Sequence, residues 1–271
     1  MKDKRILYIS SELIPYLPET EVSKTAFDVP RAMHNQGVQI RMFMPRFGVI
    51  NERRHQLHEV IRLSGMNLII NDLDMPLIIK VASIPKERMQ VYFIDNDEYF
   101  KRKAVYTDGE GKLFEDNDER AIFFAKGVVE TVKKLKWAPD IIHVTGWMAS
   151  LVPLYLKEYY KNDPLFSESK IVTSIFENQF DDEMDKDKLT EKILFDKIPD
   201  EKLDSLKKSA DKTGMLKVAI ENSDAIVKGS ESLPDELLEY LNKFDLPVLE
   251  YQPAEDIVEA YTDFYSNKVL Q

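Results

Sequence analysis

A four-residue apolar run near the start of the chain constrains the fold more than any other feature of the sequence. Ile6 to Ile9 are all apolar, and they are followed by Ser10, Ser11 and Glu12. A short run of this kind is typical of a strand that is buried on both faces of a parallel sheet. In an open α/β sheet, ligands are held where the chain leaves the carboxyl end of a central strand. We therefore expect the loop after Glu12 to carry the chemistry of the molecule.

The rest of the chain repeats the order of strand and then helix. Apolar runs predict further strands at residues 38–44, 89–94, 140–144, 170–175, 224–228 and 247–250. Amphipathic or apolar segments predict helices at residues 23–36, 116–135, 148–160, 214–222 and 234–241. Two apolar segments that flank Asn71 to Asp74 predict a β-hairpin within residues 67–84. The predicted fold class is α/β, with a single Rossmann-like, doubly wound, mostly parallel sheet and a β-hairpin insertion.

The domain organisation is predicted from the absence of linkers and repeats. No Pro/Gly/Ser-rich linker divides the sequence, so residues 1–271 are predicted to form one domain. A charged segment at about residues 181–212 is predicted to form solvated helices at one edge. Residues 253–270 are predicted to form a closing helix.

Charge and composition exclude several classes of function. The formal net charge of -11 argues against a nucleic-acid partner and against an anionic membrane surface. The chain has no cysteine, which excludes disulfides and thiolate chemistry. No apolar run approaches the roughly 20 residues that span a bilayer, and the first apolar run is too short for a signal-peptide core. We expect a cytoplasmic protein.

The loop after Glu12 lacks the features of a phosphate-binding site. Between Leu13 and Val22 there is no glycine, and the loop holds two prolines and two glutamates. Glycine is the usual residue of a phosphate cradle, because a residue without Cβ lets backbone N–H groups close around the anion. The sequence predicts neither a phosphate cradle nor a bound cofactor at this position.

An ordered set of short motifs runs through the first two thirds of the chain. The motifs are Ser10-Ser11-Glu12, Pro15, Pro30, Gly37, Pro45-Arg46-Phe47-Gly48, Asp95-Asn96 with Glu98-Tyr99-Phe100 and Arg102, Asp116-Asn117, Glu119-Arg120, Phe123, Pro139-Asp140, His143, Trp147 and residues 151–157. This set resembles the N-terminal, acceptor-side half of bacterial glycogen and starch synthases, which are retaining ADP-glucose glucosyltransferases of the GT-B fold. The resemblance covers about residues 5–175 and, more weakly, residues 214–237.

The resemblance implies a set of sugar-binding or acceptor-binding candidates. They are Asp95, Asn96, Tyr99, Asp116, Asn117 and Trp147. Asp95 and Asn96 match the acceptor-side motif, but Asp and Asn also end strands well. Trp147, Tyr99 and Phe100 could stack on a glucan, and they could equally be packed in the core.

The sequence departs from the family at the residues that contact the donor. The family loop Lys-Thr-Gly-Gly aligns with Pro18, Glu19, Thr20 and Glu21, so carboxylates stand where a cationic side chain and glycine amides face the diphosphate. The last histidine of the family motif His-x-His-Asp-Trp-His is replaced by Met148, which cannot act as an acid or a base. The family Ile-His-Asn aligns with residues 175–177, which read Ile-Phe-Glu. The resemblance therefore implies degenerate active-site motifs.

Few residues remain as candidates for catalysis or metal binding. His143 and Glu12 are the weak catalytic candidates, and His143 could equally be a hydrogen-bonded structural residue. Glu12, Glu19 and Glu21, together with Lys24, could line a polar or cation-binding rim or a solvated loop. His55 and His58 have helical spacing, but no third ligand is in sight and no metal site is predicted.

Three functions follow as hypotheses. The first is a non-catalytic, carbohydrate-associated or regulatory binding module, possible ligands being a glucan or a nucleotide sugar, with a possible protein partner. The second is a transferase that moves glucose from ADP-glucose to an α-1,4-glucan and is active only with a separate donor-domain partner, because the family needs a second Rossmann-like domain and the sequence to Gln271 leaves no room for one. The third is a protein–protein scaffold that uses the charged segment and the terminal helix.

Overall fold

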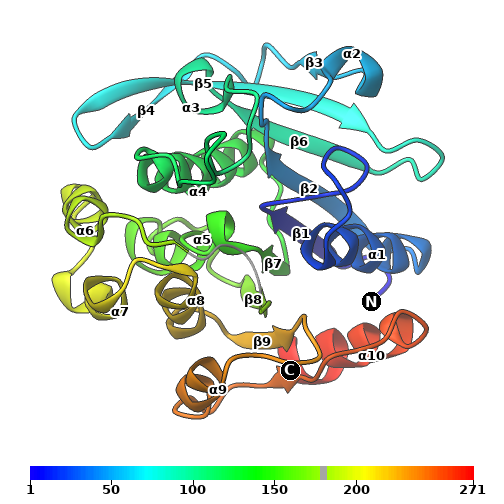
Figure 1. The fold of residues 1–271 in the computed structure, drawn as a ribbon. Coiled ribbons are helices and arrows are strands. Elements are labelled where there is room, and N and C mark those ends of the chain that lie inside the picture. Colours follow the sequence, from blue (N-terminus) through cyan, green and yellow to red (C-terminus); the bar gives the residue numbers. More distant parts are fainter. Residues whose placement is uncertain (178–181) are drawn as a thin grey trace.

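The computed structural model describes residues 1–177 and 182–271 and contains one large mixed sheet (Figure 1). Its strands follow the order β10-β9-β8-β7-β1-β2-β6-β5-β3, and all pairs from β10 to β6 are parallel. The parallel strands are β1 (Arg5–Ser10), β2 (Gln39–Pro45), β6 (Gln90–Asp95), β7 (Ile141–Thr145), β8 (Lys170–Ile175), β9 (Ala225–Lys228) and β10 (Val248–Leu249). This arrangement confirms the predicted fold class.

The strand order reverses at β1. From β1 the chain winds outward through β2 to β6 on one side, and it then returns to β7 and winds outward to β10 on the other. Ile6 to Ile9 are each at most 5% exposed, as expected of a central strand that is covered on both faces. Ligands of doubly wound folds lie at such a reversal, beyond the carboxyl ends of the strands. The candidate site is therefore expected beyond the ends of β1 and β7.

A hairpin extends one side of the sheet, as predicted. Strands β4 (Met66–Ile70) and β5 (Leu73–Ser83) are antiparallel, and the turn between them has Asn71 at a φ of 57°. Strand β5 also pairs antiparallel with β6, and β3 (His58–Glu59) pairs with β5 after the short helix α2 (Glu52–His55). Figure 1 shows the hairpin crossing the top of the molecule.

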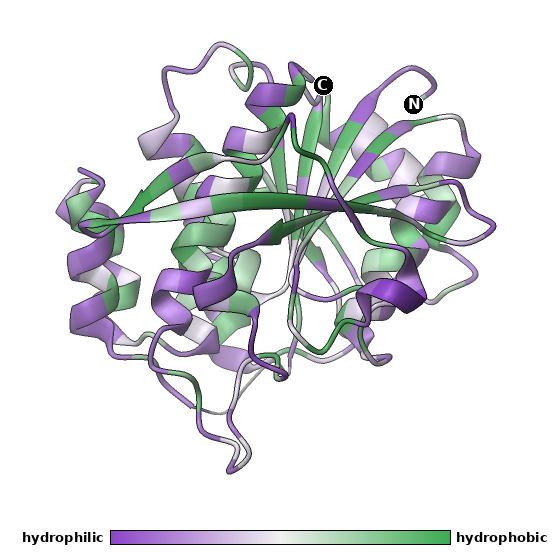
Figure 2. Ribbon diagram, turned by 90° about the horizontal axis from the view of Figure 1, so that it is seen from above, coloured by the Kyte–Doolittle hydropathy of each residue, from purple (hydrophilic) through white to green (hydrophobic). Residues whose placement is uncertain are grey.

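Helices cover both faces of the parallel sheet. Helix α1 (Glu21–Asn35) packs on β1 and β2 and lies beside the terminal helix α10 (Ile257–Phe264), which continues as the π-turn η4 (Tyr265–Val269) (Figure 1). Helix α4 (Asn117–Leu135) packs on β4 and β6, and α8 (Lys212–Glu221) packs on β8. Helix α9 (Asp235–Leu241) packs on α8. Figure 2 shows apolar strands inside and polar residues on the outer helices. No helix of the described residues is long and apolar enough to cross a membrane.

The helix that the sequence predicts at residues 148–160 is broken into three pieces. The chain forms the 3-10 turn η1 (Trp147–Ala149), the short α5 (Val152–Leu154) and the π-turn η2 (Tyr155–Tyr159). Pro153 lies in the first turn of α5, where its missing N–H does no harm. The predicted helical conformation is therefore present, but its helix type changes twice. Because residues 147–156 are buried on all sides, their apolar pattern gives no period from which these changes could be predicted.

The charged segment is packed more closely than its composition suggests. It contains α6 (Lys186–Phe195), the 3-10 turn η3 (Asp200–Leu203) and α7 (Asp204–Lys208), while Asp181, where the prediction began, lies outside the described residues. Leu189 and Ile193 are fully buried, and α6 packs against α4. The prediction of a solvated face was therefore wrong for the inner side of the segment, because its apolar residues complete the core beside α4.

A buried ion pair joins the charged segment to the rest of the molecule. The Nζ of Lys126 lies 2.6 Å from Asp196 and donates to the carbonyl of Ile69 at 2.7 Å. The other oxygen of Asp196 accepts from the hydroxyl of Tyr155 at 2.7 Å. Both charged side chains are at most 6% exposed. Removing one partner would leave a buried charge without compensation, so the pair fixes how α6 sits on α4.

Candidate functional site

The loops after β1 and β7 lie against each other at the reversal of the strand order. The N–H of Ser11 donates to the carbonyl of Thr145 at 2.9 Å, and the hydroxyl of Ser11 accepts from the N–H of Ala149 at 3.3 Å. Gly146 adopts a φ of 86°, and a Cβ there would lie 2.6 Å from the Oγ of Ser11. Only glycine allows this approach, so Gly146 holds the two loops together.

The degenerate donor loop satisfies its own polar groups. Thr20 caps α1: its hydroxyl accepts from the N–H of Ser23 at 3.0 Å, and the Oγ of Ser23 accepts from the N–H of Thr20 at 2.8 Å. The hydroxyl of Thr20 also donates to a carboxylate oxygen of Glu12 at 2.8 Å. Part of the helix terminus that would face a phosphate is therefore occupied by the chain itself.

Glu21 joins α1 to the loops after β8 and β9. The hydroxyl of Ser230 donates to Glu21 and accepts from the N–H of Glu177 at 3.1 Å. Beside it, the ring of Phe176 packs so closely on the backbone that a Cβ at Gly229 would lie 2.4 Å from it. Phe176, which the resemblance aligns with a family histidine, therefore packs against the backbone of Gly229. Pro18 and Glu19, the other two positions of the loop, are exposed.

Two residues of the histidine-rich family motif lie in the core. Met148 is fully buried, so the position of the sugar-facing histidine does not reach the site. Trp147 is 1% exposed and packs edge-on against Tyr106, with 4.9 Å between ring centroids. Its ring has no free face for a sugar, which favours the core-packing interpretation of Trp147.

Asp95 and Asn96, at the end of β6, already have interaction partners within the protein. Asp95 is 1% exposed, and its carboxylate lies 2.9 Å from the Nε of Arg46 and 3.1 Å from the Nζ of Lys80. Burial alone would lower the pKa of Lys80, but Glu52 and Asp95 outweigh it and the pKa is raised. The amide oxygen of Asn96 caps the short helix α3 (Asp97–Phe100) by accepting from two backbone N–H groups. Both residues are held as strand-ending and capping groups.

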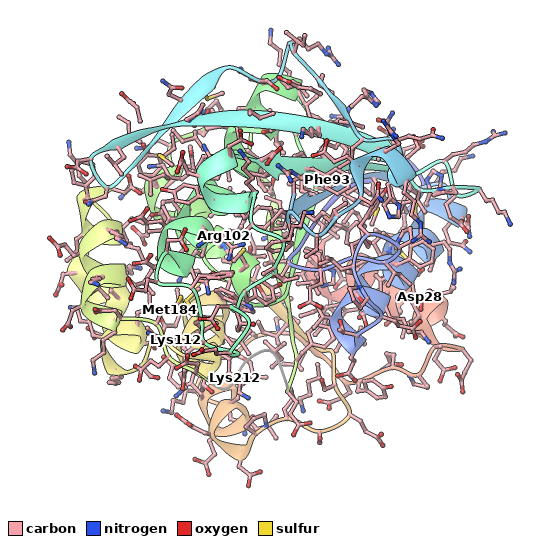
Figure 3. The ribbon with its side chains drawn as sticks, turned by 45° about the horizontal axis from the view of Figure 1, so that its top comes forward. Asp28, Phe93, Arg102, Lys112, Met184 and Lys212 are labelled. Carbon is pink, nitrogen blue, oxygen red and sulfur yellow. The ribbon has the colours of Figure 1, made fainter. Side chains whose placement is uncertain are left out.

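The remaining acceptor candidates gather where α4 begins. The hydroxyl of Tyr99 donates to Glu119 at 2.9 Å. The pKa of Tyr99 is raised, mainly by burial and to a lesser extent by the Glu119 carboxylate. Asp116 pairs with Arg102, which Figure 3 labels in this region above Lys112 and Met184. Asn117 donates to the carbonyl of Tyr106 at 2.9 Å. Tyr99, Asp116 and Asn117 thus lie in the same region, but each is already hydrogen-bonded or ion-paired to a neighbouring residue.

Two residues at the base of the site were missed as functional candidates. Arg120 is fully buried below the rings of Phe47, Phe100 and Phe114, and burial lowers its pKa to about 10. Tyr106 contacts Ser11 and Glu12. The pKa of Tyr106 is raised, mainly by burial and to a lesser extent by the Glu12 carboxylate. A single arginine at the start of an otherwise apolar helical stripe was the sequence signal for Arg120.

His143 is sealed beneath the terminal segment. Its Nε2 lies 2.7 Å from the hydroxyl of Ser174, and its Nδ1 lies 2.5 Å from the hydroxyl of Tyr265 in η4. The side chain is 2% exposed, and burial lowers its pKa to about 3. It is neutral at pH 7, and one ring nitrogen donates while the other accepts. Because both nitrogens are engaged, the structural interpretation of His143 is favoured over the catalytic one.

The two histidines with metal-like spacing lie in different elements of the structure, His55 in α2 and His58 in β3. His55 packs against Tyr16, with 5.0 Å between ring centroids, while His58 is exposed on β3. Within residues 1–177 and 182–271, no group of three His, Cys, Asp or Glu side chains could hold a metal ion.

One pocket remains open beside the donor loop. It is lined by Glu21, Lys24, Thr25, Asp28, Lys228, Gly229, Tyr251, Gln252, Ala254, Ile257 and Tyr261. About half of the wall comes from residues 251–261, which lead into the terminal helix. Figure 3 labels Asp28 on α1 at the outer surface. The pocket combines two carboxylates, two lysines, an amide and a partly exposed tyrosine, which are groups that can hydrogen-bond and stack against a polyhydroxyl ligand.

Comparison with known proteins decides the family. The model of the starch synthase catalytic domain matches residues 5–247. The chain belongs to the starch synthase catalytic domain family. Its relatives include glycogen synthases from Chlorobium luteolum, which is 35% identical over 88% of this chain and 48% of that protein, and from Chlorobium limicola, which is 34% identical over 86% and 47%. This member of the family therefore spans about half the length of the curated relatives it matches.

A solved structure agrees with the fold of this starch synthase family member. The catalytic domain of Starch Synthase IV from Arabidopsis thaliana, bound to ADP and acarbose, matches with a TM-score of 0.69 at 14% identity. The match covers 94% of this chain and 53% of that chain. Residues 248–271, which supply part of the remaining pocket and the cover of His143, lie beyond the family match.

Proposed function

We propose that this protein is a non-catalytic, carbohydrate-associated or regulatory binding module of the glycogen synthase type. The observation that carries the proposal is the internally bonded donor loop, in which Glu12 accepts from Thr20 and Glu21 accepts from Ser230. In the resemblance, Thr20 and Glu21 align with the two glycines of the family loop and Pro18 aligns with its lysine, whereas Glu12 belongs to the shared Ser-Ser-Glu motif. The proposal rests on these side chains and not on the extent of the chain.

The electrostatic cost of a diphosphate at this position supports the proposal. Two unit charges 4 Å apart interact by about 4 kcal/mol at the effective dielectric of a protein surface. Glu21, which stands at a family glycine in the resemblance, would oppose a phosphate group at that distance by an energy of this order, and the loop from Leu13 to Val22 supplies no glycine amide to offset it. A neutral glucan meets no such opposition.

A neutral oligosaccharide fits the groups that remain beside the loop. Asp28 and Gln252 line the pocket and can hydrogen-bond sugar hydroxyls, and Tyr251 is 37% exposed and can stack on a pyranose ring. We therefore place the glucan contact at this pocket, with a protein partner as the route to regulation.

Calorimetry with maltoheptaose tests this proposal. We expect the protein to bind maltoheptaose, and we expect ADP-glucose not to compete with it at the pocket beside the donor loop. Tyr251→Ala should weaken maltoheptaose binding, whereas Ile61→Ala, which trims an 81% exposed residue that does not line the pocket, should leave it unchanged. Binding of neither ligand would contradict the carbohydrate association.

A second function, a transferase that works with a separate donor-domain partner, is favoured by one observation. The chain spans about half the length of each of these glycogen synthase relatives, so this function is tested with the other half of a relative present. Incubation with ADP-glucose and glycogen, with and without the donor half of a relative, separates the two functions. Release of ADP in either mixture would replace the non-catalytic proposal with this one.

A further inference from the structure

A groove lies at the amino ends of the strands, on the opposite side of the sheet from the donor loop, and it is not part of the candidate site described above. Two adjacent pockets of about 460 and 590 Å³ share Arg88 and Gln90 at the amino end of β6. One lies between the end of α1, the start of β2 and the loop after α4. The other lies between α2, β3 and the turn that joins β5 to β6, on the right-hand side of Figure 1. We call the two pockets together the basic groove.

The basic groove is free of carboxylates. Arg41 and Arg88 line the first pocket, and Arg54 and Lys86 join Arg88 in the second. No Asp or Glu lines either pocket in the described part of the chain. The formal net charge of the whole chain is -11, so a groove of this size that has no acidic residue in its lining contrasts with the acidic composition of the chain. Three of the four histidines, His34, His55 and His58, also line it.

The four cationic side chains of the basic groove are not neutralised internally. Among the described residues, none of them lies within ion-pair distance of a carboxylate. By contrast, Arg46 and Lys80 near the carboxyl ends share Glu52 and Asp95. The unpaired positive charge of the basic groove can therefore act on a ligand.

Arg41 is held in place before any ligand arrives. Its guanidinium lies 5.5 Å from the ring centroid of Tyr92 and 5.2 Å from that of Trp137, and it donates to the hydroxyl of Tyr92. Its Nε is buried and has no hydrogen-bond partner among the described residues. Stacking on two rings fixes the plane of the guanidinium, so less side-chain entropy is lost when it binds an anion.

We propose that the basic groove binds a small anion that carries two or more phosphate groups. Guanidinium groups match phosphate oxygens in a two-pronged geometry. Pockets of about 300–1,000 Å³ suit small ligands. Arg88 lies where the two pockets meet, with Arg41 on one side and Arg54 on the other, so two anionic groups of one ligand can be held at once. The acidic surface elsewhere opposes a nucleic acid, whose backbone needs an extended basic face.

This inference is independent of the proposed function. The basic groove is built at the amino ends of β2 and β6, whereas the donor loop and the glucan pocket lie beyond the carboxyl ends. An anion in the basic groove touches none of the residues that line the glucan pocket. Failure of maltoheptaose binding would leave this inference standing, and the reverse also holds.

Titration of the full chain with pyrophosphate tests the inference. We expect saturable binding that weakens as salt is raised, because exposed charges are screened within about 10 Å at 0.1 M ionic strength. Arg88→Gln should weaken binding about tenfold, the equivalent of about 1.4 kcal/mol for one charge-assisted contact. Lys208→Gln, an equal loss of charge at the exposed end of α7, should leave it unchanged. Thermal unfolding of both variants shows that they are folded.

Three results would overturn the proposal. One is the absence of pyrophosphate binding to the wild-type chain. Another is an equal loss of affinity in Arg88→Gln and Lys208→Gln, which would indicate a diffuse charge effect. The third is binding of a poly-glutamate peptide without binding of pyrophosphate, which would assign the basic groove to an acidic partner protein. Amide shifts at Arg41, Arg88 and Gln90 on addition of pyrophosphate would place the anion.

Discussion

The two ends of the parallel strands, which we call the carboxyl edge and the amino edge of the sheet, differ in how their charged side chains are paired. Beyond the carboxyl ends, carboxylates accept from neighbouring hydroxyls or pair with buried cations, as Glu21 does with Ser230 and Asp95 with Arg46. At the amino ends of β2 and β6, Arg41 and Arg88 have no carboxylate partner among the described residues. The carboxylates named at the carboxyl ends are engaged in holding the fold, and the arginines at the amino ends are free to bind an anion. Substitutions should therefore cost stability at one edge and affinity at the other.

The largest loss of stability is expected at Asp95. Asp95→Ala removes a buried carboxylate and leaves Arg46 and Lys80 with Glu52 as their remaining partner. We expect a loss of about 3 kcal/mol, the lower end of the range for losing one partner of a buried pair. Urea unfolding measures the change. Asp97→Ala, which removes a 69% exposed carboxylate two residues away, should change stability by less than about 0.5 kcal/mol. Equal effects of the two substitutions would show that the ion pairs at the carboxyl edge do not support the fold.

The next effect is a dependence of stability on pH at His143. Burial lowers the pKa of His143 to about 3 in the folded protein, below the ordinary value of 6.5. The unfolded chain therefore binds a proton between these values and the folded chain does not. The stabilising contribution of neutral His143 is complete above pH 6.5 and is lost as the pH falls, by about 1.4 kcal/mol per unit at its steepest. In urea unfolding between pH 7 and 4.5, His143→Gln should lose stability less steeply than the wild type. Parallel slopes would contradict the buried neutral state.

A smaller effect is expected at the cap of α1. Thr20→Ala removes the acceptor for the N–H of Ser23 and the donor to Glu12, and loss of a helix cap typically costs about 1 kcal/mol. Thr20→Ser keeps both bonds and should restore most of the stability. If Thr20→Ala unfolds at the same urea concentration as the wild type, the donor loop is less firmly closed than its hydrogen bonds indicate.

The smallest effect on stability is expected in the basic groove. Arg88→Gln removes an exposed charge without an ion pair among the described residues, so its free energy of unfolding should change by no more than about 0.5 kcal/mol. The same substitution is expected to weaken pyrophosphate binding. A large loss of stability in Arg88→Gln would contradict the claim that the side chains of the basic groove do not support the fold.

The sequence was sufficient for elements whose pattern is local. The central strand at Ile6 to Ile9, the hairpin around Asn71 and the long helix from Asn117 each carry their own periodicity or boundary residues. The family motifs also located the loops of the candidate site, because their order follows the chain. The changes of helix type around Pro153 were not predicted, since a fully buried segment has no amphipathic period.

The partners of polar groups could not be predicted, because they come from distant parts of the chain. His143 meets Tyr265, which lies 122 residues further on, and Glu21 meets Ser230, which lies 209 residues further on. Lys126 finds Asp196 within a segment whose composition indicated solvent exposure. The basic groove joins four separate segments, and no spacing in the sequence connects Arg41 with Arg88 and Arg54.

A crystal of the full chain soaked with ADP tests the contrast between the two edges most directly, because one ligand with two phosphates can choose either. We predict density for the diphosphate beside Arg88 in the basic groove and none beside Thr20. A diphosphate seated at the start of α1, against the amides of Thr20 and Glu21, would contradict the account.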